Sequence, residues 1–453
     1  MDNSIGLYIH IPFCKSKCNY CDFNSYSGRE YLAGSYFNAL LSEMKNSAEA
    51  LRERPVRTIY IGGGTPSLVD SKYISRLLEI CAKYFLVDSY AEISMESNPG
   101  TLSYDSLKAY RAAGVNRLSM GLQAWQDRLL KNLGRIHRRR QFVDNLEAAF
   151  KAGFHNVNVD LIFGLPGQTF EDWAETLEAV TALCSDTPSD PDMASEKNAR
   201  TGAGISAAAG RSAVSAASGV AAFKADGISH FSCYSLKIEE DTAFGDRLGA
   251  GTLVAADDEL DRRMYGYTVE FLAHKGYKHY EISNFAKPGF ECRHNLVYWK
   301  ALEYAGFGAG AHSYLDRWRF SNAAGIEEYI EAVRKTVSGQ NDWRTAVNEK
   351  KQNSRGSAAD FTEDALCEEI QFIGRQEEMS EFMILGLRLI DGVCSREFEA
   401  RFGESLQTVY GDKLERLVKD GLLVNNSDGT VEDGYMLTPL GLDLANKVFI
   451  EFI

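Results

Sequence analysis

The sequence predicts an α/β fold: a parallel sheet curved into a partial (β/α)6 TIM-like barrel, followed by a small helical domain. From Gly6 to about Asn284, short runs rich in Ile, Val, Tyr and Phe alternate with longer segments whose apolar residues recur at helical spacing. Such runs are typical of buried parallel strands, and their alternation with helices implies right-handed crossovers in one sheet. Six units are two short of a closed barrel, and the pattern also allows an open doubly wound sheet.

The six predicted strands come in order along the first 236 residues. They are GLYIHI (6–11), RTIYIG (57–62), AEISMES (91–97), VNRLSMG (115–121), NVNVDLIFG (156–164) and ISHFSCYSL (228–236). The clearest helical segments between them are residues 31–53 and 71–85, in which apolar residues recur every three or four positions.

The chain divides into three expected parts: a core over residues 1–325, a linker and polar loop over 326–377, and a C-terminal domain over 378–453. Residues 186–224 are mostly Ala, Ser and Gly with little to bury, so we expect a flexible insertion there. The C-terminal part predicts three helices, a hairpin around Asp428-Gly429 and a final helix over 439–452. This order is that of a winged-helix-like module, and its acidic character favours packing on the core over DNA reading.

Composition and charge narrow the classes of function. The formal net charge of -14 argues against a general nucleic-acid binder, and the one dense basic run, Arg135 to Arg140, is expected to cap or flank a helix. The sequence has no apolar run long enough to span a membrane, and its first residues lack the features of a signal peptide. We therefore expect a cytoplasmic protein whose nine cysteines stay mostly reduced.

Three of those cysteines form a candidate metal site. Cys14, Cys18 and Cys21 have C-x3-C-x2-C spacing directly after the first strand, at the end of the sheet where α/β active sites lie. Soft thiolates suit zinc or an iron–sulfur cluster. Structural zinc takes four ligands, and the other six cysteines are scattered singly. This favours an iron–sulfur cluster with one open iron, while zinc and unliganded cysteines remain alternatives.

Other polar or small residues end the later strands. IGGGTPS (61–67) is neither a P-loop nor a dinucleotide fingerprint, and it is either a tight turn or a close approach to a ligand. Glu96, Gln123 and Asp160 are either solvated strand ends or residues gathered at one mouth. His294, among aromatics, is expected from the residues alone to be a packed, hydrogen-bonded side chain, and we treat His10 as structural.

The stretch YIHIPFCKSKCNYC (8–21) resembles the signature of the radical S-adenosylmethionine (SAM) superfamily. Within it, nearly the whole chain apart from 186–224 resembles the family of the oxygen-independent coproporphyrinogen III dehydrogenase HemN and the heme chaperone HemW. The resemblance implies a radical SAM fold and a [4Fe-4S] cluster on Cys14, Cys18 and Cys21, with SAM on the fourth iron. It also implies SAM contacts from Tyr8, Tyr20, Gly63, Gly64, Thr65, Glu96, Gln123, Arg135 and Asp160. In HemN, the positions of Gln123, Arg135 and Asp160 serve a second SAM.

HNLVYW (294–299) resembles an H-N-x-x-Y-W stretch that is associated with heme in HemW-type proteins, and this implies a heme contact at His294. Cys233, Cys292 and His312 are alternative heme ligands. Two features separate this chain from the dehydrogenase: Phe23 replaces a fourth cysteine, and Tyr8 is reached without a long N-terminal extension. The resemblance thus favours a heme chaperone that passes heme to an acceptor protein and takes electrons from a flavodoxin or ferredoxin. The alternatives are radical decarboxylation of coproporphyrinogen III and, more remotely, a zinc-stabilised interaction module.

Overall fold

The computed structural model describes residues 3–183, 227–338, 366–425 and 433–453. Within them, a twelve-stranded sheet has the order β14-β13-β12-β11-β1-β4-β5-β6-β7-β8-β10-β9. Its six central strands are the six that the sequence predicts, and each neighbouring pair among them is parallel. Their bounds are β1 Ile5–Ile11, β4 Pro55–Gly63, β5 Leu86–Ser97, β6 Arg117–Gln123, β7 Val157–Phe163 and β8 His230–Ser235.

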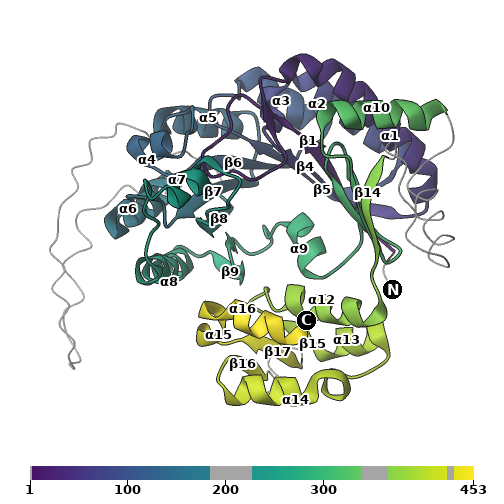
Figure 1. The fold of residues 1–453 in the computed structure, drawn as a ribbon. Coiled ribbons are helices and arrows are strands. Elements are labelled where there is room, and N and C mark those ends of the chain that lie inside the picture. Colours follow the sequence, from purple (N-terminus) through teal and green to yellow (C-terminus); the bar gives the residue numbers. More distant parts are fainter. Residues whose placement is uncertain (1–2, 184–226, 339–365, 426–432) are drawn as a thin grey trace.

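The sheet curves through an arc, and helices cover its convex side (Figure 1). Helix α1 packs against α2 and α10, α2 against α3, α3 against α5, and α6 against α8. The sheet ends at β14 and β9 and does not close, so the predicted partial barrel is confirmed. The helices on this side are α1 Ala33–Leu51, α2 Ser71–Tyr84, α3 Tyr104–Ala113, α5 Arg139–Lys151, α6 Phe170–Ala182, α8 Asp258–His274 and α10 Ile326–Ser338.

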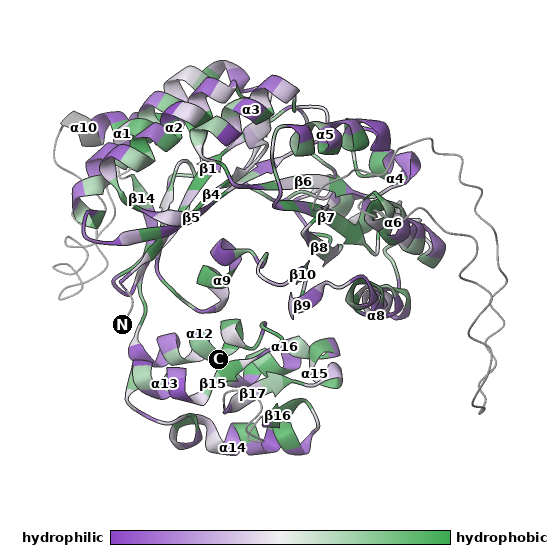
Figure 2. Ribbon diagram, turned by 180° about the vertical axis from the view of Figure 1, so that it is seen from behind, coloured by the Kyte–Doolittle hydropathy of each residue, from purple (hydrophilic) through white to green (hydrophobic). Residues whose placement is uncertain are grey.

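Side chains alternate across the central strands, and this alternation gives the concave face a polar lining. In β6, all seven residues are buried. Leu118, Met120 and Leu122 belong to the main hydrophobic core. Since successive strand residues point to opposite faces, Ser119 and Gln123 share the other face. Figure 2 shows the hydrophobic character of β7 and β8 beside the more polar outer helices.

Strands that the sequence did not reveal extend the sheet at both edges. Beside β1, residues 304–322 form β11 Tyr304–Phe307, which is parallel to β1, and then antiparallel β12 His312–Leu315 and β13 Trp318–Asn322. Strand β14, Cys367–Phe372, completes this edge, antiparallel to β13. Beside β8 lie antiparallel β10 Asn284–Ala286 and β9 Lys278–Glu281. Helix α9, Arg293–Trp299, lies within the concavity (Figure 1). The range 326–377, expected to be a linker and loop, thus contains α10 and β14.

The last part of the chain forms a unit with its own hydrophobic core. It contains α12 Arg375–Gly386, α13 Ser395–Phe402 and α14 Leu406–Lys419, with a small sheet of β15 Val393–Cys394, β17 Gly434–Leu437 and β16 Leu423–Asn425. The prediction of one continuous final helix is wrong. Leu444 leaves the helical conformation (φ -113°, ψ 27°) and divides the segment into α15 Pro439–Asp443 and α16 Ala445–Phe449, which a 3-10 turn follows.

Some expectations fall outside the described residues: the insertion at 186–224, the polar loop at 340–365 and the turn at Asp428-Gly429. The two strands of that hairpin, β16 and β17, do pair antiparallel. In the described part of the chain, no helix is both long and apolar enough to cross a membrane.

Candidate functional site

The cysteine loop lies at the carboxyl end of the parallel sheet. It leaves β1 through the short strand β2, Phe13–Cys14, which pairs with β3, Tyr26–Ser27. Asn19 holds the middle of the loop, since its backbone N–H donates to Leu133 O at 3.0 Å and its side chain donates to Asn132 O at 2.8 Å. Both acceptors lie at the end of α4, Asp127–Asn132. The loop is thereby fixed to the segment that follows β6.

Cys14, Cys18 and Cys21 are half-buried free thiols that line one cavity. The cavity encloses about 960 Å³, including its open mouth. Burial raises the pKa of the Cys21 thiol above its usual value. Because metal ligation requires the thiolate, a bound cation would shift this equilibrium toward deprotonation. Three thiols converging on one cavity suit a ligand that takes a bond from each of them.

The glycine triplet packs directly against this loop. Gly64 N donates to Ile11 O at 2.9 Å, and Thr65 N donates to Phe13 O at 2.8 Å. Gly63 has φ +115°, and a Cβ there would lie 2.6 Å from the His10 ring. A Cβ on Gly64 would lie 2.7 Å from Phe13 O and 3.0 Å from Cys14 Sγ. The triplet is therefore a close backbone approach that excludes larger residues.

Two carboxylates, one from β5 and one from β7 on either side of β6, form the floor of the cavity. Glu96 accepts hydrogen bonds from the Tyr60 hydroxyl at 2.8 Å and from Gly63 N at 3.0 Å. Asp160 accepts them from Ser119 Oγ at 2.7 Å and Asn158 Nδ2 at 2.8 Å. Burial raises the pKa of Glu96 to about 7 and also raises the pKa of Asp160. These half-buried acids are thus held at the mouth of the sheet, facing the cavity.

Gln123 and Arg135 complete the wall nearest β6. Gln123 is buried with φ +72° at an irregularity in the β6–β7 register, and strained backbone of this kind is often found at functional sites. The Arg135 guanidinium donates to Gly121 O at 2.7 Å and to Asn98 Oδ1, and it lies 3.6 Å from Cys18 Sγ. Arg135 therefore connects the cysteine loop to two strands of the sheet.

The structure brings most of the predicted site residues together. Eleven of them line the cavity: Cys14, Cys18, Tyr20, Cys21, Gly63, Gly64, Thr65, Glu96, Gln123, Arg135 and Asp160. Tyr8 does not line it, because its hydroxyl turns to His10 Nδ1 at 2.9 Å and its ring stacks on Tyr60. Sequence reasoning missed Tyr60, Asn98 and Tyr234, which also line the cavity. Asn98 could have been found, since it follows Glu96 at the same strand end.

His294 does not line this cavity. It is buried on α9, the helix that lies within the concavity of the sheet. Its Nδ1 pairs with Thr58 Oγ1 at 2.8 Å and its Nε2 with the Tyr298 hydroxyl at 3.0 Å. Burial lowers its pKa to about 3. Both ring nitrogens therefore have partners. Of the alternative heme ligands, Cys233 and Cys292 are buried and His312 is exposed.

The donor set fits an iron–sulfur cluster better than a single ion. Among the described residues, no group of three His, Cys, Asp or Glu side chains is gathered closely enough to hold one metal ion. A cubane presents a different iron to each thiolate, so it suits thiols that surround a cavity without meeting at one point. Three cysteines supply one ligand fewer than the four protein thiolates of a closed cluster.

Comparisons with known proteins agree with this chemistry. The model of the radical SAM superfamily matches residues 8–180, and that of the HemN C-terminal domain matches residues 373–443. The chain is 32% identical to the heme chaperone HemW of Bacillus subtilis over 98% of both proteins. It is also 32% identical to the HemW of Lactococcus lactis, over 98% of this chain and 96% of that protein. The Escherichia coli HemW is 36% identical over 68% of this chain and 69% of its own length.

A solved structure shares the whole fold. Coproporphyrinogen III oxidase (HemN) of Escherichia coli, described as a radical SAM enzyme, superposes with a TM-score of 0.72 at 22% identity. The superposition covers 100% of this chain and 90% of that one. Membership of the superfamily implies a [4Fe-4S] cluster and SAM as cofactors. The chain belongs to the radical SAM superfamily and, within it, to the heme chaperone HemW family.

Proposed function

We propose that this protein is a heme chaperone that binds a [4Fe-4S] cluster, SAM and heme, and delivers the heme to an acceptor protein. The observation that carries the proposal is the match to proteins named heme chaperone HemW, which spans both chains almost end to end. Cys14, Cys18 and Cys21 would hold the cluster. When bound, the reduced cluster supplies one electron for the reductive cleavage of SAM.

The cavity residues would bind and orient SAM around that cluster. The backbone of Gly63, Gly64 and Thr65 packs against the loop that carries Cys14, and it would contact SAM bound at the cluster. Glu96 would accept hydrogen bonds from the ribose hydroxyls. Tyr20, Gln123, Arg135 and Asp160 line the same space, and we assign them to SAM binding as well. Tyr8 would act through His10 and Tyr60, which it contacts.

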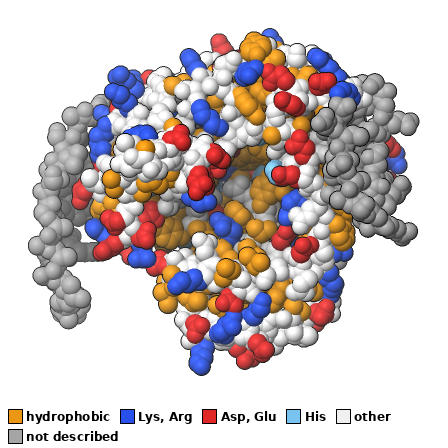
Figure 3. Space-filling model, viewed as in Figure 1, with side chains coloured by type: hydrophobic (Ala, Val, Ile, Leu, Met, Phe, Trp, Pro, Cys, Tyr) orange, Lys and Arg blue, Asp and Glu red, His pale blue; other side chains and the backbone are white. Residues whose placement is uncertain are grey.

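Heme binding needs a separate place, and a second cavity offers one. It lies between α9 and the C-terminal unit and encloses about 1450 Å³, including its open side. Its apolar walls include Tyr280, Leu296, Trp299, Phe382 and Leu389. Charged residues also line it: Lys300, Glu291, Glu397 and the ion pair between Lys278 and Asp391. Figure 3 shows the molecule hollowed between the sheet and the C-terminal unit. The aromatic and aliphatic walls would take the apolar face of a flat amphipathic ligand, and the charged residues would face its polar edge.

Phe23 favours the chaperone over the second candidate, a coproporphyrinogen III oxidase. Its ring is 61% exposed and lines the cavity beside Cys21. A phenyl ring cannot ligate iron, so this position adds no fourth thiolate near the cluster. As partners we propose an acceptor protein for heme and an electron donor of the flavodoxin or ferredoxin type. We also propose a cytoplasmic location, because iron-binding thiols must stay reduced.

Two assays on anaerobically reconstituted protein separate the candidates. The first incubates it with coproporphyrinogen III, SAM and a low-potential reductant, and the second titrates it with heme and then adds an apoprotein. We expect stable heme binding, transfer of heme to the apoprotein and no protoporphyrinogen IX. Catalytic formation of protoporphyrinogen IX would overturn the chaperone proposal and favour the oxidase.

A further inference from the structure

The basic run Arg135–Arg140 is placed where helix energetics oppose it. Helix α5 begins at Arg139 with Arg138 as its N-cap residue, so three consecutive arginines occupy its N-terminal end. The helix dipole places partial positive charge at that end, and cations there are unfavourable. The sequence expectation that this run flanks a helix is confirmed, but flanking alone gives no reason for choosing cations.

The inner end of the run contacts the cysteine loop. The Arg135 guanidinium lies 3.6 Å from Cys18 Sγ. Ile136 and His137 then line a cleft of about 330 Å³ that also includes Cys18 and Lys15. Ile136 is 54% exposed although it is a large apolar residue. The run therefore leads from the molecular surface to a thiol that would ligate the cluster.

The outer end carries more positive charge than its neighbours balance, although Asp127 Oδ1 accepts a hydrogen bond from the Arg139 backbone N–H at 2.9 Å. Arg138, Arg139 and Arg140 are exposed, as is Lys15 on the other side of the cleft. Arg140 pairs with Asp144 on the same helix at 2.9 Å. The Arg139 guanidinium lies over the Trp125 ring at 5.8 Å. In the described part of the chain, Lys15, Arg138 and Arg139 take part in none of the observed ion pairs.

This surface contrasts with the rest of the chain, whose formal net charge is -14. In Figure 3, Lys and Arg side chains gather on the upper left, over the part of the molecule where Figure 1 places α4 and α5. On an acidic protein, a local positive patch attracts an acidic partner, and the remaining negative surface repels it. Such a patch steers an acidic partner toward one orientation and raises its association rate.

We propose that Lys15, Arg138, Arg139 and Arg140 form the docking surface for an acidic protein that carries one electron on a flavin or an iron–sulfur centre. The proposal rests on the cluster assigned under the proposed function. Docking there would bring the carrier to the Cys18 edge of the cluster. In the transfer, the carrier loses one electron and the cluster gains one, and no bond or proton changes place. An electron carrier bound to this patch would therefore lie close enough to reduce the cluster.

The test is the rate at which reduced flavodoxin, an acidic flavoprotein, reduces the reconstituted cluster, followed by the loss of cluster absorbance in an anaerobic stopped-flow instrument. The variant is Arg139→Glu/Arg140→Glu. Glu suits the first turn of a helix, which offsets the loss of the Arg140–Asp144 ion pair, so we expect this variant to unfold near the wild-type temperature. The control is Lys45→Glu/Lys83→Glu, which makes the same change in net charge at exposed positions on α1 and α2.

At low ionic strength we expect flavodoxin to reduce the patch variant at least about tenfold more slowly than the wild type. The control variant should be reduced at the wild-type rate. Salt should slow the wild type and affect the variant little. Dithionite, a small reductant, should reduce all three proteins at similar rates. Equal flavodoxin rates in all three, or an equal loss in the control, would overturn the proposal. The proposal would also be overturned if the patch bound DNA or anionic lipid vesicles and its charge reversal had no effect on the rate of reduction.

Iron and heme measurements keep this test separate from the proposed function. If the wild type holds no cluster after reconstitution, the cluster assignment fails and the docking surface fails with it. If the wild type holds a cluster and binds heme, and charge reversal does not slow reduction, only the docking surface is wrong.

Discussion

The backbone N–H of Gly63 donates a 3.0 Å hydrogen bond to the carboxylate of Glu96. These residues end two adjacent parallel strands, β4 and β5, and the bond holds the glycine turn against the floor of the cavity. The other oxygen of Glu96 accepts from the Tyr60 hydroxyl at 2.8 Å. Glu96 is therefore a candidate SAM-binding residue, and it also fixes the glycine turn at Gly63.

Replacing Glu96 should weaken SAM binding. Glu96→Ala removes an acceptor for the ribose and leaves Gly63 N–H without its partner, so we expect a loss of about 1–3 kcal/mol in binding free energy. Calorimetric titration of the reconstituted protein with SAM measures it. Tyr60→Phe is the control, since it removes one hydrogen bond to Glu96 and keeps the carboxylate, and its effect should be smaller. Equal SAM affinity in wild type and Glu96→Ala would contradict the assignment.

Gly63→Ala should damage the site more than an ordinary glycine substitution. A methyl group there meets the His10 ring at 2.6 Å and must also adopt φ +115°. Gly153→Ala provides the matched control, because Gly153 has φ +89° and no atom within 4 Å of the added carbon. Both variants should lose at least about 1 kcal/mol of unfolding free energy. Only Gly63→Ala should also lose SAM affinity, and a similar loss in the control would point to strain alone.

Each cysteine of the loop should be indispensable for the cluster. In Cys14→Ala, Cys18→Ala or Cys21→Ala, two thiolates remain in the cavity, and we expect iron and sulfide to fall to background after reconstitution. Cys81→Ala and Cys394→Ala should retain both, since neither residue lines this cavity. Electron paramagnetic resonance of the reduced protein, with and without SAM, gives an independent measure. A full iron content in Cys18→Ala, or zinc as the sole metal, would refute the assignment.

The central strands and the cysteine loop could be predicted because their signals are local. Parallel strands buried on both faces appear as apolar runs, and cluster spacing appears within eight residues. The strands β11 to β14 could not be predicted, because β11 pairs with β1 some three hundred residues earlier in the chain. The segment that forms β11 and β12 is rich in Gly and aromatic residues and resembles a loop, and it becomes strand only because β11 pairs with the edge of β1.

Local sequence also did not reveal which side chains Tyr8 and His294 contact. Both were associated with ligands through resemblance, yet the direction of a side chain depends on neighbours that are distant in sequence. Tyr8 finds His10 and Tyr60, while His294 finds Thr58 and Tyr298. Gln123 shows the opposite outcome: a strand-end residue whose φ of +72° turns its side chain into the cavity.

His294 and Trp299 should therefore affect heme differently, although both belong to the same short helix. Trp299 lines the cavity beside the C-terminal unit, and His294 does not. We expect Trp299→Ala to weaken heme binding severalfold in a spectroscopic titration. His294→Ala should leave the heme absorption spectrum unchanged and lower the unfolding free energy by about 1–3 kcal/mol, because Thr58 loses a buried partner. A shifted heme spectrum in His294→Ala would instead identify this imidazole as the iron ligand.

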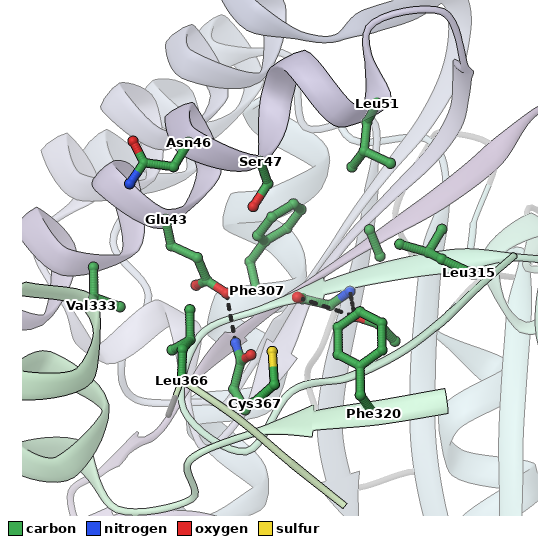
Figure 4. Close-up of a pocket in the computed structure, with 14 residues that line it drawn as sticks. Glu43, Asn46, Ser47, Leu51, Phe307, Leu315, Phe320, Val333, Leu366 and Cys367 are labelled. Carbon is green, nitrogen blue, oxygen red and sulfur yellow. Dashed lines mark hydrogen bonds between the residues drawn. The ribbon is translucent and has the colours of Figure 1, made fainter. Parts of the chain in front are cut away.

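A buried carboxylate far from the cavity should make stability depend on pH. Glu43 on α1 accepts hydrogen bonds from Asn322 Nδ2 at 2.6 Å, from Gly308 N at 3.0 Å and from the Tyr329 hydroxyl. Figure 4 shows Glu43 pointing from α1 into a small pocket bounded by Phe307, Leu366 and Cys367, among others. Burial raises its pKa from 4.5 to about 7, although the three donors oppose the shift.

The sign of the effect follows from proton binding. Between pH 4.5 and about 7, the folded carboxyl holds a proton that the unfolded one has released, so stability falls as the pH rises through this window. The full loss is about 3 kcal/mol at most. Glu43→Gln cannot titrate, and urea unfolding from pH 5 to pH 8 should therefore show a flatter slope than in the wild type. The absolute stability of this variant is not the test, because the NH2 group of the new amide would face hydrogen-bond donors that now bind the carboxylate. Glu49→Gln, exposed on the same helix, should keep the wild-type slope, and a slope unchanged in Glu43→Gln would assign the titration to another group.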